Sequence, residues 1–563
     1  MRYIYCRAVG IVVLLVASCV VAFAQENRRV EVTATYRPEV SQATKLIVPT
    51  TIDDAPIIEP EIEYNVRPQT WQVSLETADY EPVVMNNYDF RRATPLYAKV
   101  GVGCPLASDV ALRYGIHNLR VGYLGIGVEH RGDFARRSNG DGVLRSAAES
   151  YNMHNGVVLG GGVFAGRRLF EASMSYVNDI YNRYAELSSE PARVGLHRTD
   201  VSLRFGDDFC DMSHLNFAVE LHSGYWAHKL PMLTRDMTAL NEFSGGASLR
   251  LAGKLGGGMA GIDVGYDLWR GNRVFGYQDS RFDVGVDYRR RWGFVDFEVG
   301  VAYMYDMVKL REKPSHFVMP HLKVLFDIKK AALAPYVEVS THVAQNGLSS
   351  LYDKNPYIDF GAAYDTLAHM ANGVSYDMSV GIDGSLFATR FTYRVYAGVN
   401  LQRNHLFWYV TSPGTFGVVN GNNDRMFYGV ELGYRPISGL MINAGFEGHV
   451  DSTDFDFKYL SSEPKFKADV RVEYAYEGWR LYAGADVLGR REWSVLDADG
   501  VSLRSEPFAA QMCVDLQLGA AYRIKNGIEL YLDGTNLLNN RIYDYAYYYR
   551  RGIGFMCGVK LNF

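Results

Sequence analysis

The sequence predicts an all-β fold, a transmembrane antiparallel β-barrel of roughly 22 strands (18 to 22), preceded by a short extended N-terminal segment. Three observations predict this fold. From residue 93 to residue 563, apolar and polar side chains alternate along short segments. The connections between these segments alternate between short and long, and the chain ends on an aromatic residue, Phe563. A strand with one face in lipid and the other in a wet lumen requires the first of these patterns.

The composition agrees with a barrel. The 563 residues include 40 Tyr, 28 Phe and 55 Gly but only 18 Pro, and 21% of the residues are charged. This charged fraction is high for a helical membrane protein, and the aromatic content is high for a soluble one. After Gln25 no apolar run of about 18 residues occurs, so no transmembrane helix is expected. A net charge of -5 offers no basic surface, so no nucleic-acid partner is expected.

The first 24 residues are typical of a secretory signal peptide. Basic residues precede an apolar run at residues 11–21, and residues 22–24 form a small-x-small cleavage site. The mature chain would therefore begin at Gln25, followed by a proline-rich segment at residues 25–92 and the barrel at residues 93–563. A lipoprotein signal is the alternative, and it would make Cys19 a lipidated N-terminus.

The alternation that defines the strands is clearest at residues 466–476. One face carries Phe466, Ala468, Val470, Val472, Tyr474 and Tyr476. The other carries Lys467, Asp469, Arg471 and Glu473. Turning a Lys or Arg toward lipid would cost about 2 to 4 kcal/mol at the bilayer midplane, so the charged face is expected in the lumen. Residues 479–487 repeat the pattern after a tight turn at Glu477 and Gly478, and residues 262–268, 282–289 and 511–518 follow it as well.

The connections between strands follow the order of an outer-membrane barrel, in which short periplasmic turns alternate with longer external loops. Short turns are expected near Asn526, Gly478, Ser438, Ala388, Ala331, Gly293, Gly256, Asp211, Gly166 and His117. Long connections are expected at residues 536–551, 490–507, 452–465, 410–425, 345–371, 308–316, 270–280, 228–240, 182–194 and 132–152, with a short one near Pro105. This order predicts an integral outer-membrane protein, in contact with outer-membrane lipid, with both chain ends on the periplasmic side.

No catalytic, cofactor or metal site is expected from the residues. The cysteines of the mature chain, Cys104, Cys210, Cys513 and Cys557, are scattered and show no metal-ligand spacing. A bridge between Cys513 and Cys557 on neighbouring C-terminal strands is left open. No Ser, His and acid combination, HExxH sequence, P-loop or carboxylate pair stands out, so the protein is not expected to be an enzyme.

The last strand is expected to serve in assembly as well as in the wall. Phe555, Val559, Leu561 and the terminal Phe563 share one face of it. A C-terminal aromatic residue on an amphipathic strand resembles the signal that the outer-membrane barrel assembly machinery recognises, which makes that machinery an expected partner.

Residues 528–563 contain a characteristic series of motifs. Asn536–Asn539 read Asn-Leu-Leu-Asn at the end of the penultimate strand, a Tyr-rich loop with Tyr549 and Arg551 follows, and the last strand ends at Phe563. This series is similar to the closing hairpin of TonB-dependent receptors. Near the N-terminus, six residues resemble the segment by which such receptors reach TonB through strand addition: Val30, Glu31, Val32, Thr33, Ala34 and Thr35. An ordinary β-prone stretch in a tail is the alternative.

The resemblance implies solute or nutrient transport across the outer membrane, with TonB as a partner. Members of that family carry a globular plug between these two regions, and residues 25–92 are too few for one. Because barrels of this size normally hold a plugged lumen, residues 37–92 are expected to enter the lumen, or a separate protein to occlude it. The alternative function is a plugless scaffold or assembly partner for a periplasmic protein or lipoprotein.

One loop could bind a ligand at the cell surface. It carries Tyr543, Tyr545, Tyr547, Tyr548 and Tyr549 beside Arg550 and Arg551. Stacking and cation–π contacts would suit a sugar or a peptide. Packing within the loop, or an aromatic girdle at the membrane interface, is the alternative.

Overall fold

The computed structural model describes residues 95–563 apart from short gaps. These gaps are residues 119–120, 189–190, 230–238, 272–277, 309–314, 329–332, 360–371, 388, 454–461, 498–499, 501 and 526. The predicted signal peptide, the segment at residues 25–92 and the TonB-box-like residues 30–35 lie outside the described residues.

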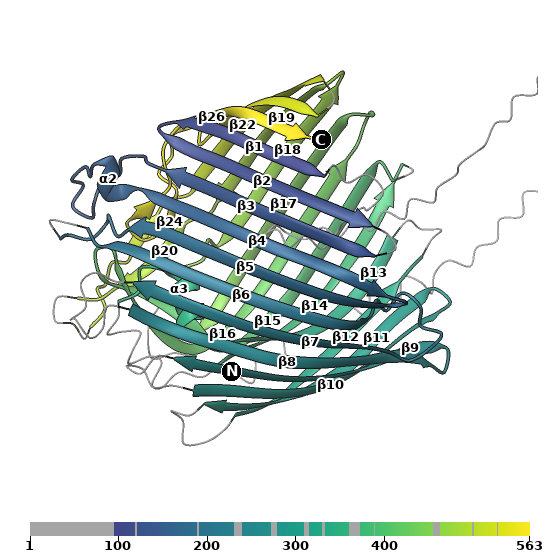
Figure 1. Cartoon of the computed structure of the whole chain (residues 1–563). Helices are drawn as coiled ribbons and strands as arrows, with labels where there is room; N and C mark the ends of the chain where they lie inside the picture. Colours follow the sequence, from purple (N-terminus) through teal and green to yellow (C-terminus); the bar gives the residue numbers. More distant parts are fainter. Residues whose placement is uncertain are drawn as a thin grey trace, which may run out of the picture. The chain divides into compact units, whose positions relative to one another are not determined.

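A closed antiparallel barrel of 22 strands forms the molecule, as the sequence predicts (Figure 1). The strands are β1 (Leu96–Cys104), β2 (Ala107–Asn118), β3 (Gly122–Asp133), β4 (Asn152–Ala165), β5 (Arg168–Asn182), β6 (Arg193–Asp207), β7 (Asn216–Lys229), β8 (Ala239–Leu255), β9 (Gly258–Gly271), β10 (Gln278–Trp292), β11 (Val295–Val308), β12 (Ser315–Phe326), β13 (Leu333–Ala344), β14 (Gly373–Leu386), β15 (Phe391–Ser412), β16 (Thr415–Tyr434), β17 (Leu440–Thr453), β18 (Phe466–Tyr476), β19 (Trp479–Leu488), β22 (Cys513–Lys525), β23 (Ile528–Thr535) and β26 (Gly554–Asn562). The last strand closes the ring on the first, with Tyr97 opposite Asn562 and Cys104 opposite Phe555.

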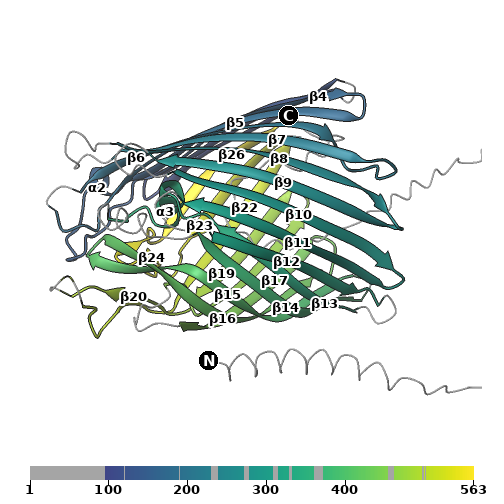
Figure 2. The ribbon, with the colours of Figure 1, turned by 90° about the horizontal axis from the view of Figure 1, so that it is seen from below.

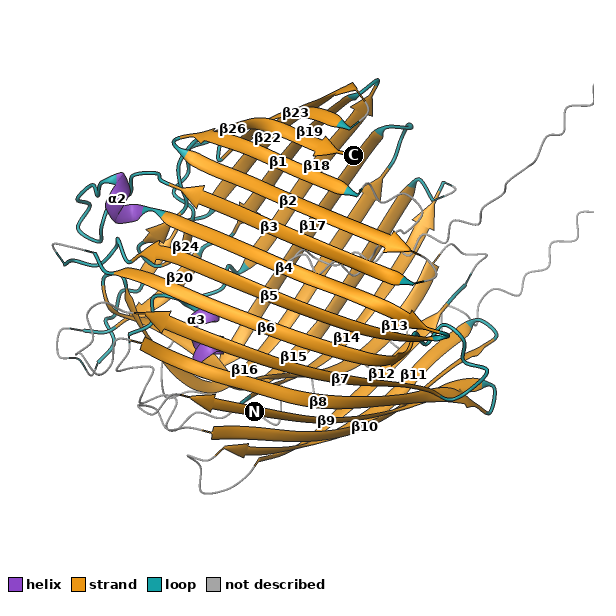
Figure 3. Ribbon diagram, viewed as in Figure 1, coloured by secondary structure: helices purple, strands orange, loops and turns teal. Residues whose placement is uncertain are grey.

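The short elements lie together at one end of the barrel, which we call the long-loop end (Figures 1 and 2). They are α2 (Ala147–Ser150), α3 (Leu348–Lys354), β20 (Arg491–Val495), β21 (Phe508–Ala510), β24 (Tyr543–Tyr545) and β25 (Tyr548–Tyr549). Strands dominate the rest of the described chain (Figure 3). The C-terminus lies at the opposite, short-turn end, where the Leu96 N–H donates to the Phe563 carbonyl at 2.9 Å.

The predicted outward faces are confirmed, because the apolar positions are exposed on the barrel. Ile262, Tyr266, Phe282 and Val286 are between 40% and 50% exposed. Ile262 pairs with Val286 and Tyr266 with Phe282, so apolar residues continue across strands β9 and β10. Water-soluble proteins rarely expose a continuous apolar band of this kind, whereas a barrel in lipid requires one.

The lumenal charges pair with one another across neighbouring strands. The Lys99 ammonium lies 2.5 Å from Asp109, Arg204 lies 2.7 Å from Glu171, and Arg394 lies 2.8 Å from Asp383. Such pairs satisfy charged groups that the strand alternation places in the lumen.

The alternation of short and long connections is also confirmed, with one correction. The long connection predicted at residues 410–425 is wrong, because β15 and β16 continue to a two-residue turn at Pro413 and Gly414. Gly414 has a φ of +83°, which the turn requires and which glycine adopts without a steric penalty. The β-prone aromatic residues at 405–419 extend the hairpin because they pack against other loops. A bulge between Gln402 and His405 marks where the extension begins.

The bridge left open between Cys513 and Cys557 does not form. Both cysteines are free, and β23 lies between their strands β22 and β26. Among the described residues, no helix is long and apolar enough to cross a membrane.

Candidate functional site: a loop cap and its cavity

The hydrophobic core of the barrel lies at the long-loop end. The largest fully buried side chains are Trp493, Tyr352, Phe407, Phe416, Leu240, Leu348, Leu351, Ile358, Ile542, His228, Val194 and Val410. All of them lie in long connections, in the β15–β16 extension, or at strand ends that lead into long connections. We call the four segments at residues 183–188, 345–359, 403–421 and 541–551 the cap.

Helix α3 begins the segment at residues 345–359. Glu242 at the start of β8 accepts the Leu348 backbone N–H at 2.8 Å and the Ser349 hydroxyl at 2.5 Å. A carboxylate at this position satisfies donors of the first helical turn that have no partner within the helix. Leu348, Leu351 and Tyr352 then bury their side chains in a cluster with residues of the barrel wall. The helix is therefore held by a charged contact at its start and an apolar face along its length.

This segment runs from the end of β13 to β5 across the mouth of the barrel. The Tyr181 hydroxyl of β5 donates to the Pro356 carbonyl at 3.0 Å. Beside this contact, the Asp359 N–H donates to the Phe416 carbonyl at 2.7 Å, near the tip of the β15–β16 hairpin.

This hairpin reaches the same place from the opposite side of the barrel. Strands β5 and β16 are eleven positions apart in a ring of 22. Gly414 at the tip of the hairpin nevertheless lies against Ala185, which follows β5. Residues 345–359 and the hairpin therefore cover the mouth together.

The tyrosine loop packs onto this crossing segment. The rings of Tyr357 and Tyr548 stack with centroids 3.4 Å apart and planes 9° apart. The Tyr548 hydroxyl donates to the Gly414 carbonyl at 2.9 Å, and the Tyr545 hydroxyl donates to the Lys354 carbonyl at 3.1 Å. Burial raises the pKa of Tyr548 well above its usual value, so its hydroxyl remains a neutral donor.

Arg183 fixes the crossing segment from the end of β5. Its guanidinium is buried and donates to the Tyr357 carbonyl at 2.9 Å. It also pairs with Glu186 at 2.6 Å. Burial raises the pKa of Glu186, although the neighbouring Arg183 opposes this shift. The buried guanidinium thus provides a hydrogen-bond donor for a loop carbonyl that has no partner in a β-sheet.

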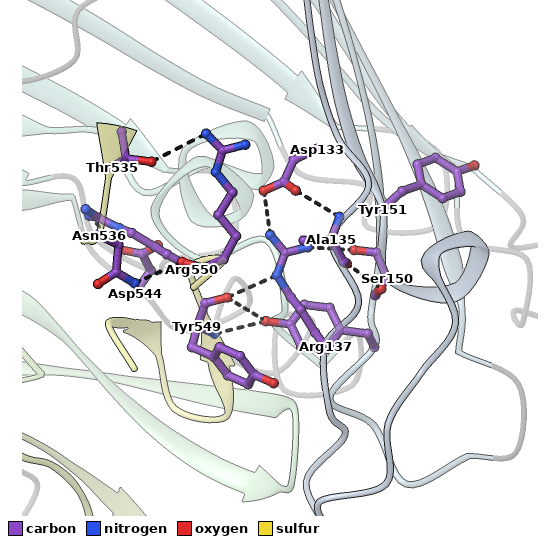
Figure 4. A network of polar contacts seen from close by, with 12 residues as sticks. Asp133, Ala135, Arg137, Ser150, Tyr151, Thr535, Asn536, Asp544, Tyr549 and Arg550 are labelled. Carbon is purple, nitrogen blue, oxygen red and sulfur yellow. Dashed lines mark hydrogen bonds and ion pairs between the residues drawn. The ribbon is translucent and has the colours of Figure 1, made fainter. Parts of the chain in front are cut away.

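Arg137 ties the tyrosine loop to the connection between β3 and β4 (Figure 4). Its guanidinium pairs with Asp133 at 2.7 Å and donates to the carbonyls of Ser150 at 2.8 Å and Tyr549 at 3.2 Å. The Ser150 hydroxyl donates to the Ala135 carbonyl at 2.9 Å. Arg137 is 5% exposed, so these groups replace water around its charge. One buried cation thus joins segments that are 412 positions apart in the sequence.

A cavity of about 820 Å³ adjoins the cap. Strand ends of β13, β14 and β15 line one part of it, while α3, β20 and the tyrosine loop line another. The aromatic side chains at its edge are Trp408, Trp493 and Tyr545, and the charged or titratable ones are His342, Lys354, Arg403, His405, Glu463, Arg491 and Asp544. A cavity of this size with a few convergent polar groups is the usual form of a small-molecule site.

The residues predicted from the sequence divide between the cap and the wall. In the tyrosine loop, Tyr548 is buried, Tyr543, Tyr545, Tyr547, Tyr549 and Arg551 are half-buried, and Arg550 is exposed. Of these, Tyr545 lines the cavity. The residues of the predicted assembly signal, Phe555, Val559, Leu561 and Phe563, lie in or directly after β26, and Phe555 and Phe563 are 48% and 53% exposed. Assembly and surface binding therefore remain predictions for these two sets.

Sequence reasoning missed α3, the buried arginines and the cavity. Leu348, Leu351 and Tyr352 are spaced as one face of a helix inside a segment that we took for a loop. That spacing was a usable signal. Arg137, Arg183 and Arg491 carried no signal of their role in the cap, since each donates there to a backbone carbonyl far away in the sequence.

Comparison with known proteins gives structural likeness without sequence likeness. No protein-family model and no curated protein matches the chain. Among solved structures, the FrpB iron transporter from Neisseria meningitidis aligns with a TM-score of 0.66 at 10% identity, over 83% of this chain and 81% of that one. The copper transporter OprC aligns with a TM-score of 0.64 at 12% identity, over 84% and 82%. The ferric-catecholate import receptor Fiu of E. coli K12, in a closed form, aligns with a TM-score of 0.60 at 10% identity, over 84% and 82%.

These three structures, described as transporters and a receptor, share the fold of this chain. The likeness therefore shows a shared barrel fold. In the part of the chain that the structure describes, no group of three or more His, Cys, Asp or Glu side chains could hold a metal ion.

Proposed function

We propose that this protein imports a solute across the outer membrane through a barrel that its own loops close. The observation that carries the proposal is the cap, which spans the mouth and leaves a lined cavity of about 820 Å³ beside it. A barrel that only filtered solutes by size would gain nothing from a buried aromatic core across its opening. A closed mouth beside a ligand-sized cavity suits capture of a solute before passage.

The orientation follows from the connections. Short turns and the paired ends Leu96 and Phe563 lie at one end, and the cap lies at the other. In outer-membrane barrels the short turns face the periplasm and the long loops face outside. The cap would then meet the solute first, and both termini would be periplasmic.

TonB is the proposed source of energy, through Val30, Glu31, Val32, Thr33, Ala34 and Thr35. The similarity of residues 528–563 to the closing hairpin of TonB-dependent receptors supports this, as does the likeness to import receptors in fold. We further propose that residues 37–92 occupy the lumen below the cap, since a globular plug does not fit in so short a segment.

The test is a cross-link in living cells. With a photo-crosslinking amino acid at Val32 of the full chain, we expect a covalent adduct with TonB, and a version of that chain lacking residues 33–35 should lose it. Deletion of residues 39–41 serves as the matched control, and heat-modifiable mobility on gels reports that each barrel is folded. An adduct that persists without residues 33–35 would contradict the TonB proposal.

The alternative function is a scaffold that anchors periplasmic proteins or lipoproteins. The cap favours this alternative because a barrel that stays closed passes no solute. Affinity purification in detergent from cells with and without TonB separates the two functions. Stoichiometric partners that persist without TonB, together with a silent barrel in planar bilayers at every condition tried, would favour the scaffold.

A further inference from the structure

We propose that the cavity beside the cap binds an anionic small molecule, one that carries carboxylate or phosphate groups, through Lys354 and Arg491. This inference names a substrate class for the proposed import function. It rests on that function only in calling the bound molecule a substrate. The binding site itself stands on the charges, contacts and size of the cavity.

The first step is the state of the acidic side chains in the cavity. Glu463 lies 2.6 Å from the guanidinium of Arg425. Asp544 accepts from Arg550 at 2.9 Å and 3.0 Å. Each carboxylate that lines the cavity therefore has an arginine within ion-pair distance, which it shares with a second carboxylate, Asp451 for Arg425 and Asp515 for Arg550.

The second step is the state of the basic side chains. Arg403 pairs with Asp424 at 2.8 Å, and His342 lies 3.6 Å from Asp377. Lys354 and Arg491 differ from both. Among the residues that the structure describes, no carboxylate lies within ion-pair distance of either cation.

The third step is what holds these two cations in place. The Lys354 ammonium donates to the Asn346 side-chain oxygen at 3.3 Å. The Arg491 guanidinium donates to the carbonyls of Ser462 at 2.9 Å and Tyr543 at 2.7 Å, and it lies 4.9 Å from the ring centre of Trp493. All of these partners are neutral, so they orient the cations without cancelling their charge.

Burial raises the energetic cost of leaving these two cations without a direct ion-pair partner. It lowers the pKa of Lys354 and the pKa of Arg491 below their usual values, because both cations are partly withdrawn from water. A bound carboxylate or phosphate would supply the missing counter-charge and accept hydrogen bonds from both groups. Trp408 and Tyr545 at the edge of the cavity would contact the uncharged part of the same molecule.

The experiment uses the purified full chain in detergent and isothermal titration calorimetry at constant ionic strength. Citrate is the carboxylate probe, pyrophosphate the phosphate probe, spermidine the cationic probe and glucose the neutral probe. We expect citrate or pyrophosphate to bind, more weakly as salt is added, while spermidine and glucose do not. Binding of one anion and not the other identifies the acidic group. If neither anion binds more tightly than glucose, the proposal is overturned.

Substitutions assign the binding to the two cations. Lys354→Gln and Arg491→Gln should each weaken anion binding about tenfold, the effect of losing one hydrogen bond to a charged group. Lys354→Arg and Arg491→Lys keep the charge and should recover most of the affinity. The matched controls are Lys323→Gln and Arg250→Gln, because these two side chains do not line the cavity and have acidic partners at 3.2 Å and 3.5 Å.

Lys354 distinguishes loss of binding from loss of structure, because it lines the cavity and makes one side-chain hydrogen bond to a neutral group. Lys354→Gln should leave the barrel folded, so unchanged anion binding in that variant would overturn the proposal. A chain that lacks residues 30–35 should bind the anion as the full chain does. Loss of transport with binding intact would therefore count against the proposed function and leave this inference standing.

Discussion

The barrel wall and the cap are stabilised by different means. The wall is a ring of backbone ladders whose apolar side chains face outward, and many of these remain exposed within the protein itself, such as Val286 at 50% and Leu518 at 48%. The cap buries Phe416, Leu348 and Ile358 completely. Lipid is the partner of the wall residues, whereas the cap residues are partners of one another.

This difference means that closure of the mouth and folding of the barrel can be separated. The cap is joined to the wall by the β15–β16 hairpin and by groups at strand ends, such as Glu242 and Arg183, while the ladders between the other wall strands lie outside it. Local opening of a segment requires less free energy than unfolding of the whole chain. We therefore expect substitutions in the cap to change opening and substitutions in the wall to change unfolding.

The largest effect is expected for Phe416→Ala. Truncating a fully buried phenylalanine lowers the stability of the structure packed around it by about 3 to 5 kcal/mol. The backbone of Phe416 also makes hydrogen bonds to the crossing segment at residues 357–359. We expect faster amide hydrogen exchange in residues 345–359 and measurable conductance in planar bilayers. Global unfolding of the barrel should change little.

The control for this substitution is Phe446→Ala on β17, where Phe446 is 39% exposed on the lipid face. It should leave exchange in residues 345–359 unaltered. If Phe416→Ala instead unfolds the barrel while cap exchange keeps its wild-type rate, cap and wall are one cooperative unit and the separation is wrong.

The next effect concerns the wall and compares two neighbouring positions of β22. Leu518→Arg places a charge on the lipid face and should destabilise the barrel by about 2 to 4 kcal/mol in equilibrium unfolding. Gln517→Arg should be close to neutral, because Gln517 already donates to Asp486 at 3.1 Å in the lumen. Equal destabilisation by both would contradict the assigned register.

The wall could be predicted from the sequence because the alternation of polar and apolar residues is a property of each strand by itself. A strand between lipid and lumen places polar and apolar residues alternately, so residues 466–476 show their faces without knowledge of any partner. The ending at Asn536–Asn539 and Phe563, which resembles the closing hairpin of TonB-dependent receptors, then identified the last two strands of the barrel. Strand number, closure and faces followed from these features alone.

The cap could not be predicted from the sequence, because its contacts join residues far apart in the chain and follow no periodic pattern. Arg137 meets Tyr549, and Arg183 meets Tyr357, in pairs that no periodicity links. The pattern at residues 405–419 even misled us, because an extended hairpin and a loop rich in aromatic residues look alike until packing partners are known. The tyrosine loop was noticed as a group, but its role in closing the mouth depends on α3, which lies about 190 positions earlier in the chain.

The smallest expected effect, for Tyr548→Phe, tests the cap at the level of one hydrogen bond. The variant keeps the ring that stacks on Tyr357 and removes the hydroxyl that donates to the buried Gly414 carbonyl at 2.9 Å. Leaving that carbonyl without its partner should weaken closure by about 1 to 2 kcal/mol, or roughly tenfold in the exchange rate of amides at residues 345–359.

Tyr266→Phe on the lipid face of β9 is the matched control, since Tyr266 is 45% exposed and belongs to neither buried cluster at the long-loop end. It should leave exchange in residues 345–359 as it is. Because the Tyr548 hydroxyl joins the tyrosine loop to the tip of the β15–β16 hairpin, faster exchange should reach both segments together and spare the strands below Gln402. Exchange that quickened only in the tyrosine loop would mean that the four segments of the cap open one by one.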